Sequence, residues 1–201
     1  MADTGAPWNL PYPLGTDLVR DGAQAIQDLA EATATGLSNI PVLAGIGSNT
    51  VQAVKLNTFS TSSATFTTVT GLTVTITPSS ASARVLILVN AHMSATGTNA
   101  EGTHIRIDGG NSATFIGNAD GSRVRAAGTF QNALSEFNIT RAAVPMGLMY
   151  LDSPATASPV TYEVQMRVSS GTAFFNRPTT DANSAAFGRV ASSIIAIEVA
   201  P

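Results

Sequence analysis

Alternation of apolar and hydroxyl-bearing residues is the pattern that most constrains this chain. In the segment 70–78, TGLTVTITP, the residues Leu72, Val74 and Ile76 alternate with threonines. The segment 162–169, YEVQMRVS, again has apolar residues at every second position. A period of two places successive side chains on opposite faces of an extended strand. These segments therefore predict β-strands with one buried face.

Composition and turn signals extend this prediction over most of the chain. The sequence contains 25 threonines and 19 serines, and only 11% of its residues are charged. Threonine favours strands, and turn-forming sequences such as DGGN at 108–111 separate the strand-like segments. About eight strands within residues 51–201 are typical of two packed antiparallel sheets. We expect a mainly β fold, with an antiparallel β-sandwich or jelly-roll-like domain at 51–201.

Two segments are apolar on both faces. Val85 to Val89 is an uninterrupted aliphatic run, typical of a central strand covered from both sides. The segment 192–200, SSIIAIEVA, has Ile195, Ile197 and Val199 on one face, whereas Glu198 shares the other face with Ile194 and Ala196. We expect the face that carries Glu198 to be buried between subunits.

The N-terminus has a different character. Proline fixes φ and lacks a backbone N–H, so residues 1–15 predict an extended, proline-rich arm. Its apolar and proline side chains are expected to anchor the protein to a larger particle: Pro7, Trp8, Leu10, Pro11, Tyr12, Pro13 and Leu14.

A short helix is expected at 16–36, where Thr16 is placed to cap it and Gly36 to end it. Its small and apolar residues recur at heptad-like spacing. This seam is expected to pack against identical helices in a homotrimer: Leu18, Gly22, Ala25, Ile26, Leu29 and Ala32. Residues 37–50 are expected to link the helix to the β domain.

Several classes of function have no support in the sequence. The net charge of −3 and the single lysine disfavour nucleic-acid binding, and no segment is apolar for long enough to span a membrane. There are no cysteines, and His92 and His104 have no second ligand at metal spacing. No nucleophile elbow or phosphate loop occurs. We expect no catalytic residues, no metal and no cofactor.

Three long segments carry a resemblance to a known family. Residues 65–91 (TFTTVTGLTVTITPSSASARVLILVNA), 105–127 and 171–199 resemble the C-terminal β domain of fibre, tail-tip and minor tail proteins of tailed bacteriophages. Residues 7–32 are similar to the N-terminal segments of such proteins in phages of actinobacteria. The resemblance implies a homotrimeric virion protein, made in the host cytoplasm, anchored by its N-terminus and displaying its β domains.

The expected function is host attachment as a trimeric tail fibre or tail-tip component. Its partners would be other copies of the chain, other tail or capsid proteins, and a glycan or protein of the host surface. Polar residues in exposed turns are the candidates for contact with the host: Asp108, Asn111, Asn118, Asp120, Thr180, Asp181 and Asn183. Two alternatives remain open: a fibre or decoration protein of the capsid head, and a small hydrolase of host polysaccharide.

Overall fold

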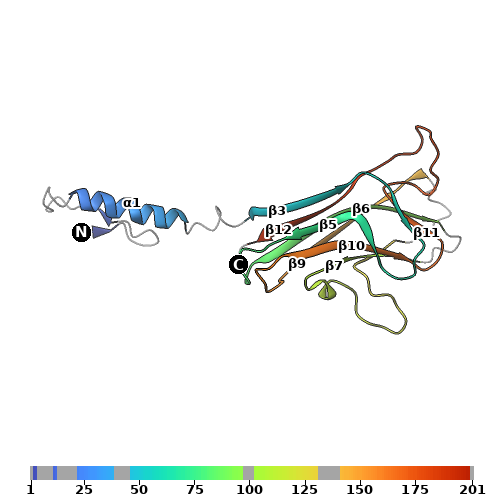
Figure 1. The fold of residues 1–201 in the computed structure, drawn as a ribbon, viewed down its shortest axis with the longest axis horizontal. Helices are drawn as coiled ribbons and strands as arrows, with labels where there is room; N and C mark the ends of the chain where they lie inside the picture. Colours follow the sequence, from blue (N-terminus) through green and yellow to red (C-terminus); the bar gives the residue numbers. More distant parts are fainter. Residues whose placement is uncertain are drawn as a thin grey trace. The chain divides into compact units, whose positions relative to one another are not determined.

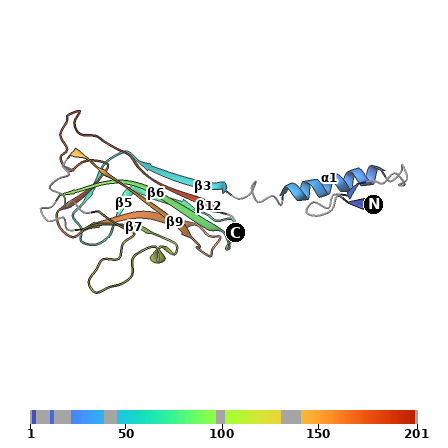
Figure 2. The same cartoon turned by 180° about the vertical axis from the view of Figure 1, so that it is seen from behind.

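The computed structural model of the chain describes residues 2–3, 11–12, 22–38, 46–96, 102–130 and 141–199. The chain divides into two compact units, Met1–Ile46 and Gly47–Pro201. Figures 1 and 2 show the helix of the first unit and the sheets of the second from opposite sides. Within the described residues, no helix is both long enough and apolar enough to cross a membrane.

The N-terminal unit contains two very short strands and one helix. Strand β1 (Ala2–Asp3) pairs antiparallel with β2 (Pro11–Tyr12), and the other residues of the expected arm at 1–15 lie outside the described residues. Helix α1 spans Gly22–Ser38 and contacts β2. The helix continues through Gly36, the residue expected to end it. Residues 16–21 of the expected helix lie outside the described residues.

The second unit contains two antiparallel sheets (Figure 1). The four-stranded sheet has the order β5 (Thr67–Ile76), β10 (Val160–Val168), β7 (Thr103–Asp108) and β8 (Gly128–Phe130). The six-stranded sheet consists of β3 (Ile46–Lys55), β4 (Phe59–Thr61), β6 (Arg84–Thr96), β9 (Val144–Asp152), β11 (Thr172–Phe175) and β12 (Ser192–Val199). Strand β3 thus begins within the expected linker at 37–50.

The two sheets share one hydrophobic core, as in a β-sandwich. The four-stranded sheet contributes residues such as Leu72, Ile76 and Tyr162, and the six-stranded sheet contributes residues such as Ile87 and Phe175. All five side chains are at most 1% exposed. The expectation of a mainly β chain with antiparallel sheets is confirmed, and the predicted alternation in β5 and β10 places its apolar residues inside.

The expected assignment of the two faces of β12 is wrong. Ile194, Ala196 and Glu198 are buried within this chain, whereas Ile195 and Ile197 lie on the outer face and are only partly covered. Glu198 can lie inside because other segments satisfy its carboxylate. Ser79 donates to it from both its backbone N–H, at 2.9 Å, and its hydroxyl, and the Asn49 amide donates at 3.0 Å.

The central strand β6 is likewise covered on one face only in the described chain. Val85, Ile87 and Val89 are buried in the core, but the outward-pointing Leu86 and Leu88 are only partly covered.

Candidate functional site

Two long excursions leave the sheets and carry most of the residues expected to face the host. The first excursion, residues 109–127, connects β7 to β8 and contains the 3₁₀ turn η2 (Ser112–Thr114). The second excursion, residues 177–191, lies between β11 and β12. We describe first how each one is attached to the sheets.

The second excursion interrupts what would otherwise be one strand. Phe175 pairs with Met93 of β6, and Ser193 pairs with Asn90 of the same strand, both in antiparallel register. Eighteen residue steps separate Phe175 from Ser193, but only three separate their partners. β11 and β12 therefore continue one line of pairing along β6, into which the fifteen residues of the excursion are inserted.

Hydrogen bonds at His92 show that β11 and β12 lie on the same edge of β6. The backbone N–H of His92 donates to Ser192 Oγ at 2.9 Å, and its carbonyl accepts from the N–H of Asn176 at 3.0 Å. The N–H and C=O of one strand residue point to the same edge. Because β9 pairs with the same residues of β6 as β12 does, β9 occupies the opposite edge.

Asn176 closes the base of the insertion. Its side chain is fully buried, and its φ of 61° lies in the left-handed region, which asparagine tolerates better than most residues. The side-chain Oδ1 accepts from Ser192 Oγ at 2.6 Å, which joins the two ends of the excursion. The Nδ2 donates to the carbonyls of Lys55 at 2.7 Å and Asn57 at 3.0 Å, between β3 and β4. The Asn176 amide therefore connects the two ends of the second excursion and also bonds to the segment between β3 and β4.

Ion pairs add order within the second excursion. Asp181 lies between two guanidinium groups, with Arg177 Nη1 at 2.8 Å and Arg189 Nη2 at 2.7 Å from its carboxylate oxygens. Arg177 also stacks over the ring of Phe174 at 3.9 Å, and its carbonyl accepts from Ser94 Oγ at 2.8 Å. The excursion is thus tied to β11 and β6 at its base and cross-linked at Asp181.

The first excursion is held by the buried carboxylate of Asp152, at the end of β9. Its Oδ1 accepts from the hydroxyl of Tyr150 and the backbone N–H of Ser153, both at 2.9 Å, and from the N–H of Asn111 at 3.2 Å. Its Oδ2 accepts from the hydroxyl of Tyr162 at 2.5 Å. Burial and then the hydrogen bond to Asp152 raise the pKa of Tyr162, so this phenol stays a donor.

Aromatic packing supports the same attachment. The rings of Phe115 and Tyr150 stack with centroids 5.0 Å apart. The Tyr150 hydroxyl oxygen also lies 2.9 Å from the carbonyl oxygen of Asn111 and 2.9 Å from the Thr114 hydroxyl. Its one proton is shared between the Asn111 carbonyl and Asp152. The first excursion is therefore pinned to β9 near its start, and residues 117–125 extend from that point.

The structure distributes most of the expected contact residues over these two excursions and does not bring them together at one place. Asn118, Asp120, Thr180, Asp181 and Asn183 are exposed loop residues. Asp120 pairs with Arg123, and Asp181 with Arg177 and Arg189. Asp108, at the end of β7, is partly exposed and lies 3.5 Å from Arg106, and Asn111 is exposed but bonded to Asp152 and Ser153.

The residues expected to form the helical seam differ in how far they are exposed to solvent. Ala25 is 3% exposed, whereas Ile26 is 69% and Leu29 is 36% exposed. Gly22 and Ala32 are partly exposed. Leu18 lies outside the described residues, as do Pro7, Trp8, Leu10, Pro13 and Leu14 of the arm; of Pro11 and Tyr12 only the backbone is described.

The titratable groups do not gather at one place. In the ranges that the structure describes, no three His, Asp or Glu side chains form a group able to hold a metal ion. Burial, with a contribution from Arg167, lowers the pKa of His104 on β7. Burial also lowers the pKa of Lys55, whose Nζ donates at 2.7 Å to both the Asn57 side chain and the Thr70 carbonyl.

Asp152 and Asn176 are the residues that the sequence analysis missed. Both are polar residues at the ends of apolar strand segments, MGLMYLD and TAFFN. Asp152 lies on the same face of β9 as Leu148, which is buried. The other face carries Met149 and Leu151, which are apolar as well. The alternation in the sequence therefore does not show which face of β9 is inside.

The geometry offers a β-sheet scaffold to which two excursions are attached by buried polar side chains. Comparison with known proteins adds no assignment to it: no protein-family model and no curated protein matches this sequence.

Proposed function

We propose that the chain is a structural protein of a phage virion, a tail fibre or tail-tip component that displays its β domain for attachment to the host surface. The support comes from the resemblance of residues 65–91, 105–127 and 171–199 to such β domains, together with the two pinned excursions. The observation that carries the proposal is the attachment of each excursion to the scaffold by one fully buried polar residue, Asp152 or Asn176.

Pinned loops suit attachment for a thermodynamic reason. A loop that is already ordered loses less conformational entropy when it binds than a loop that must be fixed on binding. Several copies on one particle then raise the effective concentration of each weak site. The proposed homotrimer, with the proline-rich arm as its anchor in the particle, supplies this multivalency.

The proposal is tested on phage particles that carry the chain. Antibodies against the β domain should label the tail in electron micrographs; labelling of the head would instead support the capsid-fibre alternative. The purified full chain should compete with particles for adsorption to host cells. Absence of the chain from particles would overturn the proposal.

Loop variants test whether the excursions make the contact. Asn118→Trp and Asn183→Trp add bulk to exposed positions of the two excursions without touching Asp152 or Asn176. We expect at least one of them to abolish competition for adsorption. Thr73→Trp, on the exposed face of β5, is the matched control and should compete as the parent does. Equal competition by all three variants would exclude the excursions as the contact.

A further inference from the structure

One row across the four-stranded sheet combines three side chains that can donate hydrogen bonds. The register aligns Arg167 of β10 with His104 of β7, and His104 with Thr129 of β8. All three side chains lie on the outer face and are at least partly exposed. Nδ1 of His104 lies 3.2 Å from the Thr129 hydroxyl. Side chains directly opposite each other on neighbouring strands are within reach of one another, so this row brings a guanidinium and an imidazole together.

A hydroxyl lies beside this row, at the end of the β7–β10 pair. The same register, continued past the strand ends, brings Ser169 opposite Gly102, and the N–H of Ser169 donates to the carbonyl of Gly102 at 3.3 Å. A Cβ on Gly102 would lie 2.7 Å from both Cε1 and Nε2 of His104, so the imidazole ring lies over this glycine. Nη2 of Arg167 lies 3.5 Å from the Ser169 hydroxyl. The guanidinium, the imidazole and the hydroxyl are therefore gathered around Gly102, which has no side chain.

Arg167 lacks the partners that several other arginines of this domain have. Its Nε is buried and has no hydrogen-bond partner within the described residues, and the contact of Nη2 with Ser169 is at the limit of a hydrogen bond. Ion pairs in the described part of the chain are made by other arginines: Arg106, Arg123, Arg177 and Arg189. A partly buried guanidinium with unmet donors is suited to an acceptor from outside the chain.

The carboxylates nearest in the register are engaged elsewhere. On β7, the outward neighbour of His104 is Arg106, which pairs with Asp108 farther along the strand. On β10, Glu163 is two rows beyond Arg167 and accepts from two neighbouring side chains, at 2.6 Å and 2.7 Å. Strand β8 contains no titratable residue. The charge of Arg167 is therefore not balanced by a carboxylate on the strands that pack beside it.

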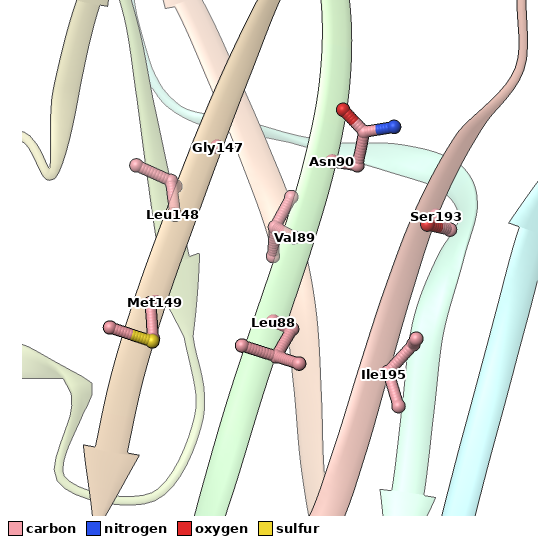
Figure 3. A pocket seen from close by; sticks show the side chains of 8 residues that line it. All are labelled: Leu88, Val89, Asn90, Gly147, Leu148, Met149, Ser193 and Ile195. Carbon is pink, nitrogen blue, oxygen red and sulfur yellow. The ribbon is translucent and has the colours of Figure 1, made fainter.

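The outer face of the six-stranded sheet offers no comparable group. Between β6, β9 and β12 this face has a hollow of about 320 Å³ (Figure 3). Figure 3 shows Leu88, Met149 and Ile195 around it, with Asn90 and Ser193 as its polar side chains. None of the residues that line the hollow carries a charge. Taking an anion out of water without a counter-charge is costly, so an anionic ligand fits the row of Arg167 and not this hollow.

We propose that Arg167, His104 and Ser169 bind an oxyanion, a carboxylate or phosphate group of a host-surface polymer. A guanidinium binds such groups through two parallel N–H donors, and a hydroxyl adds a further donor. When Nδ1 of His104 accepts from Thr129, Nε2 carries the proton and is itself a donor. The inference rests on the proposed function for the source of the oxyanion, and it deepens that function by naming the chemical group that is bound.

Proton NMR of the full chain tests the site, because the chain has two histidines, His104 and His92 on β6. Their ring protons are titrated with pH in sodium chloride, and then at the same ionic strength in sodium phosphate or sodium glucuronate. Burial and then the charge of Arg167 lower the pKa of His104. A bound anion offsets the charge, so the titration midpoint of His104 should rise by about 0.5–1 pH unit, and that of His92 should not change. A response to phosphate or to glucuronate identifies the group; a response to neither overturns the inference.

Substitutions separate binding from folding. Arg167→Gln removes the guanidinium and should abolish the response to the anion, whereas the matched control Arg123→Gln, in the first excursion, should respond as the parent does. Ser169→Asp places a carboxylate at an exposed position beside Arg167. It should raise the His104 midpoint in sodium chloride alone and block a further rise with phosphate. An unchanged His92 signal shows that a variant is folded. An undiminished anion response in Arg167→Gln or in Ser169→Asp would contradict the proposed site.

The two proposals fail in different ways. If phosphate or glucuronate acts on the purified chain but phage particles lack the chain, the oxyanion site stands and the proposed function fails. If particles contain the chain but neither anion shifts the titration of His104, only the oxyanion site fails.

Discussion

The hydroxyl of Tyr162 donates a 2.5 Å hydrogen bond to Oδ2 of Asp152, and both side chains are fully buried. This contact joins β10 of the four-stranded sheet to β9 of the six-stranded sheet. The same carboxylate holds the first excursion through the backbone N–H of Asn111. The same side chain therefore contributes both to the stability of the sandwich and to the attachment of the first excursion.

Asp152→Ala should destabilise the fold strongly. It leaves the buried hydroxyl of Tyr162 and the backbone N–H groups of Ser153 and Asn111 without their acceptor, and buried donors that lose their partner are costly. We expect the free energy of unfolding to fall by about 3 kcal/mol or more, measured by denaturant titration. The control Asp120→Ala removes an exposed ion pair with Arg123 and should change the free energy of unfolding by less than about 1 kcal/mol. Equal effects would refute the role assigned to Asp152.

Glu198 predicts a loss of stability in acid. The hydrogen bond from the Ser79 hydroxyl is the main cause that lowers the pKa of this carboxyl in the folded chain. The folded state therefore binds this proton less readily than the unfolded state. The stabilisation is complete above the unfolded pKa of about 4.3 and is lost as the pH falls through the lower folded value.

Ser79→Ala should remove part of this acid dependence. Loss of the hydroxyl should lower the free energy of unfolding by about 1 kcal/mol at neutral pH and by less at low pH, where Glu198 is protonated. Unfolding titrations from pH 7 to pH 3 measure the difference. A parallel loss at every pH would show that the hydroxyl does not act through the charge of Glu198.

Asn176→Gly tests the closure of the second excursion. Glycine accepts the backbone φ of 61°, so this substitution removes the side-chain bonds without adding backbone strain. The buried carbonyl of Lys55 and the hydroxyl of Ser192 lose their partner, and we expect a loss of about 2–4 kcal/mol. Amide hydrogen exchange should also rise in residues 177–191. In Asn183→Gly, an exposed control, stability should change by less than about 1 kcal/mol.

Two glycines in left-handed backbone provide a matched comparison. Gly171 has φ +78°, and a Cβ there would lie 2.0 Å from the carbonyl oxygen of Thr96, whereas Gly121 has φ +55° and open space around it. Gly171→Ala combines strain with a backbone clash and should cost about 3 kcal/mol or more, whereas Gly121→Ala has the strain alone and should cost about 1 kcal/mol. Thermal unfolding of the two variants decides the comparison.

Local pattern was enough to predict the strands whose two faces differ in chemistry. In β5, threonines alternate with Leu72, Val74 and Ile76, so only one assignment of faces is possible, and these three residues are buried. In β12 both faces contain isoleucine, and the pattern does not discriminate between them. Glu198 is inside because Ser79 and Asn49, which are far away in sequence, satisfy it.

The candidate site was predictable in position but not in construction. Turn residues such as Asp108 to Asn111 and Asp120 indicate a loop, and the first excursion occurs there. The hydrogen bonds of Asn176 reach Lys55, Asn57 and Ser192, which depends on which strands become neighbours in the sheet. That neighbourhood is a property of the tertiary fold, so the residues that pin the excursions could not be identified from spacing.

The pairing of β12 with β6 begins at Ser193, in the register that it would have if residues 177–191 were absent. The pairing of β11 and β12 with β6 therefore does not depend on the length or composition of this segment, provided that Asn176 and Ser192 keep the same neighbours. We therefore expect that other loops can replace residues 177–191 while β11 and β12 keep their register with β6.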